Sequence, residues 1–141
     1  MKTLYLSTLL MASVIPAASA FAATQTPRAD HPTMIDGVQT VCTGGSENAR
    51  ANPSWMSYPT RIEFAGRHGQ SLGDETVNIA GEGKNLSVHC AGPWLLMKLP
   101  KGNYQLSADV YGAGQKNMKI FAPGRIVVRF PNAGGQETKT S

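Results

Sequence analysis

The segment 92–110 constrains the fold of this chain more than any other, because apolar and polar residues alternate along it. Every second position is apolar on both sides of a short break: Leu95, Met97, Leu99, Tyr104, Leu106, Ala108 and Val110. Pro100 and Gly102 predict a tight turn at this break, since proline ends a strand and glycine tolerates positive φ. The pattern therefore predicts a hairpin of two half-buried strands that run back to back.

Similar alternation recurs along the rest of the chain, in runs separated by turn residues. In addition to 94–99 and 104–110, these runs predict short strands at 37–42, 60–65, 77–79, 86–90, 118–120 and 125–130. The exception is a short helical turn that Ser46 can cap and that Asn52-Pro53 ends. Short strands at regular spacing, without a long helix, predict an all-β fold: a seven- to eight-stranded antiparallel β-sandwich.

The first 20 residues have the pattern of a secretory signal peptide: Lys2, an apolar run at 4–18 and a small-residue triplet that ends at Ala20. Cleavage after Ala20 or after Ala22 fits this pattern. An uncleaved membrane anchor is the alternative, but the apolar run is shorter than the roughly 20 residues of a membrane span. We therefore expect a periplasmic or secreted protein that does not span the membrane after cleavage. Its parts are a flexible leader at 21–36, one domain at 37–131 and a disordered tail at 132–141.

The formal net charge is +4, and the basic residues are dispersed rather than clustered, which argues against a nucleic-acid partner. The only two cysteines, Cys42 and Cys90, lie at the ends of expected strands. In an oxidising compartment such a pair predicts a disulfide. A metal site formed by Cys90 and its neighbour His89 is the alternative, but adjacent residues on a strand point to opposite faces.

Three motifs carry a family resemblance: Gly-Gly at 44–45, Gly-Pro-Trp at 92–94 and Leu-Pro-Lys-Gly-Asn-Tyr at 99–104. Over 37–130 the chain resembles the carboxypeptidase regulatory-like, transthyretin-like domain, and most closely a group of small exported bacterial proteins. The resemblance implies a Greek-key β-sandwich of the transthyretin (prealbumin) type that serves as an accessory or binding domain. One enzymatic branch, the hydroxyisourate hydrolases, ends in Tyr-Arg-Gly-Ser, whereas this chain ends in Glu-Thr-Lys-Thr-Ser. Hydrolase activity of that type is therefore not expected.

No combination of residues suggests catalysis. The adjacent carboxylates Asp74 and Glu75 follow a glycine and are expected to be solvated in a loop. His31, His68 and His89 have no spacing that favours a metal site or a proton relay. We therefore expect no catalytic residues, no metal and no cofactor.

The best candidates for a binding surface are Trp55 and Tyr58, which lie in an irregular segment between expected strands. Exposed there, they would contact a sugar or a protein, whereas the alternative is that they cap one end of the sandwich. The polar loop with Arg67 and His68 is the second candidate, and Trp94 is expected to pack over the core near the disulfide. These features predict a non-catalytic module with a structural or protein-interaction role and an envelope protein or a glycan as partner. A carbohydrate- or small-ligand-binding module is the alternative.

Overall fold

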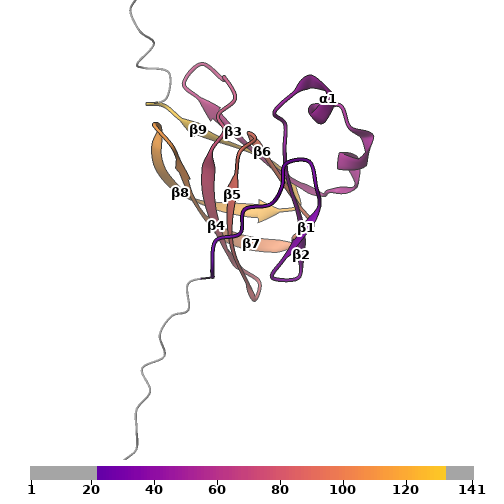
Figure 1. Ribbon diagram of the computed structural model, residues 1–141. Helices are drawn as coiled ribbons and strands as arrows, with labels where there is room; N and C mark the ends of the chain where they lie inside the picture. The colour runs from indigo at the N-terminus through magenta and orange to yellow at the C-terminus, as the bar shows by residue number, and fades with distance from the viewer. Residues whose placement is uncertain (1–21, 133–141) are drawn as a thin grey trace, which may run out of the picture.

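The computed structural model describes residues 22–132, which form a β-sandwich of two sheets (Figure 1). The five-stranded sheet has the order β1 (Thr33–Ile35), β2 (Val38–Thr43), β6 (Trp94–Met97), β3 (Thr60–Gly66) and β9 (Gly124–Phe130). The four-stranded sheet has the order β5 (Lys84–Cys90), β4 (Glu75–Gly81), β7 (Gly102–Val110) and β8 (Gly114–Ala122). The predicted all-β sandwich is thus confirmed. The described residues contain nine strands rather than seven or eight, and β3 and β9 pair in parallel.

The core lies between the sheets and consists of the residues that the alternation predicts, such as Leu95 and Met97 of β6 and Leu106 of β7. The predicted hairpin at 94–110 is wrong, however, because β6 pairs with β2 and β3 whereas β7 pairs with β4 and β8. The turn at Pro100 therefore carries the chain from one sheet to the other. The Tyr104 hydroxyl donates to the Pro100 carbonyl and so ties the new strand to this turn.

Residues 22–36, expected to belong to a flexible leader, are attached to the sandwich. Gln25 forms a parallel bridge with Val88 at the edge of β5, and residues 33–35 form β1 against β2. Between these points the Asp30 amide donates to the Cys42 carbonyl over 2.8 Å. Local alternation did not reveal this segment because its contacts are with distant strands. The predicted signal peptide at 1–20 and the last residues of the predicted tail, 133–141, lie outside the described residues.

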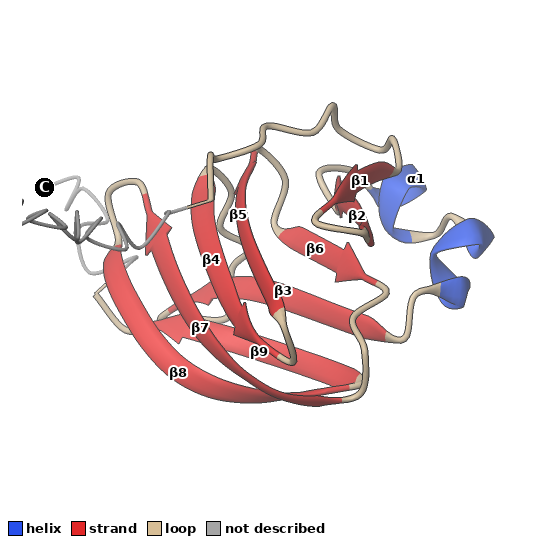
Figure 2. Ribbon diagram, turned by 90° about the horizontal axis from the view of Figure 1, so that it is seen from below, coloured by secondary structure: helices blue, strands red, loops and turns tan. Residues whose placement is uncertain are grey.

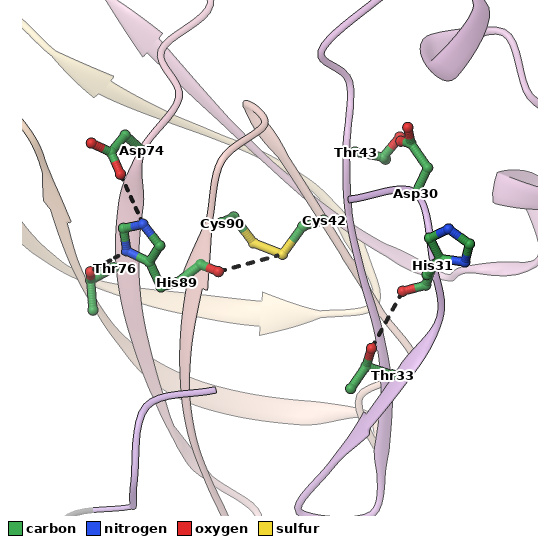
Figure 3. The surroundings of a disulfide bond; sticks show 9 residues. All are labelled: Asp30, His31, Thr33, Cys42, Thr43, Asp74, Thr76, His89 and Cys90. Atoms are coloured by element: carbon green, nitrogen blue, oxygen red, sulfur yellow. Dashed lines mark hydrogen bonds and ion pairs between the residues drawn. A yellow bond between two sulfur atoms is a disulfide. The ribbon is translucent and has the colours of Figure 1, made fainter. Parts of the chain in front are cut away.

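The predicted disulfide is present between Cys42 of β2 and Cys90 of β5 (Figure 3). Both cysteines are buried and belong to the core, so the bond joins the two sheets from the inside. The two cysteines are 48 positions apart in the sequence, so the bond closes a long loop. Neighbouring His89 points to the outer face, as expected for adjacent residues of a strand.

The connection between β2 and β3 contains helix α1 (Glu47–Arg50) and the 3-10 helix η1 (Pro53–Ser57). Ser46 caps α1, as predicted, because its hydroxyl accepts a hydrogen bond of 3.1 Å from the Ala49 amide. Figures 1 and 2 place this connection beside β1, β2 and β6. It covers part of the outer face of the five-stranded sheet, where Val41, Tyr58 and Leu96 form a second, small core with Trp55 packed against it.

Candidate functional site

Trp55 and Tyr58 lie together, with ring centroids 6.1 Å apart in an edge-to-face arrangement. Tyr58 is only 8% exposed, and burial raises the pKa of its hydroxyl. Trp55 is half-buried, and its indole Nε1–H donates to the Ala49 carbonyl over 2.8 Å. Tyr58 therefore packs against the sandwich, in agreement with the structural alternative given for it above. Trp55 is only partly buried, so one side of its ring packs against the protein and the other is accessible.

Arg67 and His68 are exposed in the loop between β3 and β4, as expected. They follow the C-terminal end of β3, whereas Trp55 and Tyr58 precede its N-terminal end. A strand of this length spans about 20 Å at the usual rise per residue. The structure therefore does not bring the two candidate surfaces into one cluster.

A hollow of about 300 Å³ opens on the outer face of the five-stranded sheet, beside the helical connection. Its lining is arginine, aromatic and thioether side chains together with small and polar residues: Arg50, Asn52, Trp55, Met56, Tyr58, Pro59, Arg61, Trp94, Leu96, Gly124 and Arg125. Trp55 and Tyr58 are the binding candidates expected from the sequence, whereas the three arginines were not expected here. The alternation already indicates their outward position, because Arg61 and Arg125 are next to Ile62, which lies in the core, and Ile126, which packs against it.

Trp94 is not over the core near the disulfide, which corrects the expectation for this residue. Leu95 and Met97 point inward, so Trp94 points outward and lines the hollow. Its ring lies against Gly44, where an added Cβ would approach the Trp94 Cγ to 2.7 Å. The Arg61 guanidinium stacks over the same ring, 4.5 Å from its centroid. Trp94 thus holds Arg61 in a fixed position at the surface.

The Glu63 carboxylate contacts both Arg61 and Arg125. Its side chain is 12% exposed, its Oε2 lies 3.9 Å from Arg61 Nε, and it accepts a hydrogen bond from Arg125 Nε. This hydrogen bond raises the pKa of the Arg125 guanidinium. One mostly buried acid therefore orients two arginines whose side chains remain 35% and 62% exposed.

A second hollow of about 160 Å³ continues along the same face. It shares Trp94 and Arg125 with the first and is otherwise lined by Glu63, Phe64, Ala65, Gly69, Ser71, Val127 and Arg129. Because Trp94 and Arg125 line both hollows, the two hollows adjoin and form one site on the face of β3, β6 and β9. We call it the arginine groove, after Arg50, Arg61, Arg125 and Arg129.

The outer face of the other sheet carries a smaller polar cluster around His89 (Figure 3). Its Nε2 lies 2.8 Å from Asp74 Oδ1, and its Nδ1 lies 2.9 Å from Thr76 Oγ1. These residues line a hollow of about 230 Å³ with Asp109 and Tyr111. Both imidazole nitrogens are therefore engaged by side chains of the protein itself.

Glu75 differs from the sequence expectation, since it is fully buried rather than solvated. It begins β4 in phase with the inward residues Val77 and Ile79 and is paired in register with Cys90. Within residues 22–132, neither carboxyl oxygen has a hydrogen-bond partner apart from the residue's own backbone. Burial raises the pKa of Glu75 to about 9, so the folded protein holds it as the neutral acid at pH 7.

Among residues 22–132, no group of three or more His, Cys, Asp or Glu side chains is arranged to hold a metal ion. Neither described helix has the length and hydrophobicity of a membrane span. A scan of the chain against protein-family models found no match, and a search of curated proteins found no similar sequence.

Proposed function

We propose that this protein is an exported, non-catalytic interaction module of the carboxypeptidase regulatory-like type that holds a protein partner through the arginine groove. The observation that carries the proposal is the composition of the groove. Arginine, tryptophan and tyrosine dominate the binding energy of protein interfaces, and this lining combines all three. Met56, at 88% exposure, adds a flexible apolar side chain to its rim.

The rings in the groove favour a protein over a sugar as the ligand. Stacking on a sugar needs an open ring face, but Trp94 carries the Arg61 guanidinium over its ring and packs against Gly44. Trp55 is half-buried with its N–H already satisfied. Partly buried aromatic rings beside stacked arginines are instead typical of hot spots in protein interfaces.

A carbohydrate or small ligand is the second candidate, and the hollow on the four-stranded sheet is the feature that favours it. Tyr111 is 86% exposed and lines the hollow on the four-stranded sheet with Asp109 and His89. An exposed tyrosine beside hydrogen-bonding side chains suits a sugar, because its ring stacks while the polar groups contact hydroxyls. In this alternative the arginine groove has only a structural role.

The proposed compartment is the periplasm or the cell exterior. The disulfide joining the two sheets supports an oxidising environment, since such bonds persist there and are rare in the cytosol. Charged residues on edge strands discourage pairing with other chains, and the edge strands β5, β8 and β9 carry Lys84, Lys119 and Arg129.

Site-specific photo-crosslinking in cells that produce the full chain tests this proposal. A photo-reactive amino acid replaces Met56 at the rim of the groove, and in a matched control it replaces Phe121 of β8. Both positions are exposed, at 88% and 51%, and they belong to different faces of the sandwich. We expect one discrete cross-linked protein from position 56 and none from position 121. Equal cross-linking from both positions, or none from position 56, would refute the proposal.

A further inference from the structure

We propose that the arginine groove recognises carboxylates, and that its ligand is an extended acidic segment of the partner protein. This inference rests on the proposed function, because it names the chemistry by which the partner is held. Three properties of the groove carry it: its charge, its unused hydrogen-bond donors and its shape.

The charge of the groove is strongly positive. Four arginines line the two hollows, and among residues 22–132 Glu63 is the only acidic one in either lining. Arg61 and Arg125 both contact that single carboxylate, so most of the positive charge is uncompensated. A ligand that enters the groove therefore gains most when it carries negative charge.

The groove also has more donors than its own contacts use. Each guanidinium has five N–H donors in a planar fork that fits a carboxylate in bidentate fashion. Arg50 donates to the Gly44 carbonyl over 3.3 Å, and the contacts of Arg61 and Arg125 with Glu63 involve their Nε atoms. In the part of the chain that the structure describes, the terminal amino groups of Arg61 and Arg125 therefore remain available to a ligand.

The shape of the groove favours an extended chain over a compact anion. Two hollows of about 300 and 160 Å³ follow one another along the sheet and share Trp94 and Arg125. A phosphate or a single carboxylate would fill only part of one hollow. A peptide can place an apolar side chain against Trp55 and Met56 while its acidic side chains reach the arginines.

Glu63 has a specific part in this arrangement. Its carboxylate lies in the groove and already binds two of the arginines, as an acidic side chain of a ligand would. It both orients the guanidinium groups and competes with the incoming acid. Replacement of Glu63 by glutamine, which keeps its shape and removes its charge, should therefore strengthen the binding of acidic ligands.

The chain offers an internal reporter for the test, because its only two tryptophans both line the groove. The probe is the blocked pentapeptide Glu-Leu-Glu-Leu-Glu, and its neutral control is Gln-Leu-Gln-Leu-Gln. We expect the acidic peptide to change the tryptophan fluorescence in a saturable manner. The neutral peptide should bind at least about tenfold more weakly, because it cannot form charge-assisted hydrogen bonds with the arginines. Raising the salt concentration should weaken the binding of the acidic peptide, because salt screens the attraction between charges at an exposed surface.

Three variants show where the peptide binds. Their affinities are measured by titration calorimetry rather than fluorescence, because Arg61 contacts the Trp94 ring and its replacement would change the tryptophan signal itself. We expect Arg61→Gln to lower the affinity for the acidic peptide about tenfold or more, and Glu63→Gln to raise this affinity several-fold. Lys119→Gln removes the same charge from the four-stranded sheet and should leave binding unchanged. Thermal melts of each variant separate a loss of binding from a loss of folding.

Several outcomes would overturn the inference. They are equal binding of the neutral peptide, no saturable binding of the acidic one up to about 1 mM, an unchanged affinity in Arg61→Gln, or equally tight binding of an oligogalacturonate. The last result would assign the groove to acidic glycans. If position 56 still cross-links a protein partner while the acidic peptide fails, the proposed function stands and only the carboxylate chemistry is wrong.

Discussion

Glu75 should make the stability of this protein fall as the pH rises through the neutral range. In the unfolded chain the carboxyl loses its proton near its ordinary pKa of 4.5, whereas the folded protein keeps the proton until about pH 9. Between these values the folded state binds one proton more than the unfolded state, so alkali favours unfolding. The stability is fully present below pH 4.5 and decreases until the folded carboxyl ionises near pH 9.

The size of the effect follows from the pKa difference. Each pH unit between the two values removes about 1.4 kcal/mol of unfolding free energy, so the loss from pH 5 to pH 8 is about 4 kcal/mol. Burial also raises the pKa values of Tyr58 and Tyr104 above their ordinary 10.0, but those groups act only in stronger alkali. A loss of this size is a large part of the stability of a small domain.

The assay is urea unfolding followed by circular dichroism at pH 5, 6, 7 and 8. We expect Glu75→Gln, which keeps the shape of the neutral acid and cannot ionise, to abolish most of the slope and to be the more stable protein at pH 8. Glu47→Gln removes an exposed carboxylate from α1 and should keep the wild-type slope. A wild-type slope that persists in Glu75→Gln would show that the buried carboxyl does not carry the extra proton.

Three further sets of substitutions test the fold. Replacement of either cysteine of the disulfide by alanine should cost about 2–5 kcal/mol of unfolding free energy in denaturant titrations, and non-reducing mass spectrometry should find no free thiol in exported wild-type protein. Gly102→Val should lower the melting temperature far more than Lys101→Val, because Gly102 has φ +153, a backbone conformation that a β-branched residue rarely adopts; equal shifts would contradict this reading. Tyr58→Ala should cost about 2–4 kcal/mol, whereas Met56→Ala should be nearly neutral, and the reverse order would show that Tyr58 is not part of the small core.

Alternation along the chain predicted the inward residues well and the pairing of the strands poorly. Leu95, Met97 and Leu106 face the core as expected. Period-two alternation says which side chains share a face, but it does not say which strands are neighbours. Strands β6 and β7 are consecutive and alternate in the same way, yet they lie in opposite sheets. Residues 22–36 were missed for a related reason, since distant strands and not local alternation hold them in place.

Trp94 and Glu75 lie elsewhere than expected, although the alternation indicates the correct position of each. Trp94 is out of phase with Leu95, and this places it on the outer face with the arginines. Glu75 is in phase with Val77, and this places it in the core. In both cases residue type was given more weight than position: a tryptophan was expected inside and a glutamate outside. The arginine groove itself requires the α1 and η1 connection to lie beside β3 and β9, which only the tertiary fold defines.

Chemical-shift mapping by NMR shows directly whether ligands bind in the arginine groove. The blocked acidic pentapeptide is titrated into the ¹⁵N-labelled chain while the backbone amides and the two indole N–H signals are followed. We expect both indole signals and the amides of Arg61 and Arg125 to shift together, while the amides of Asp109 and Tyr111 do not move. Shifts confined to Asp109, Tyr111 and their neighbours would contradict it, because they would place the ligand on the four-stranded sheet.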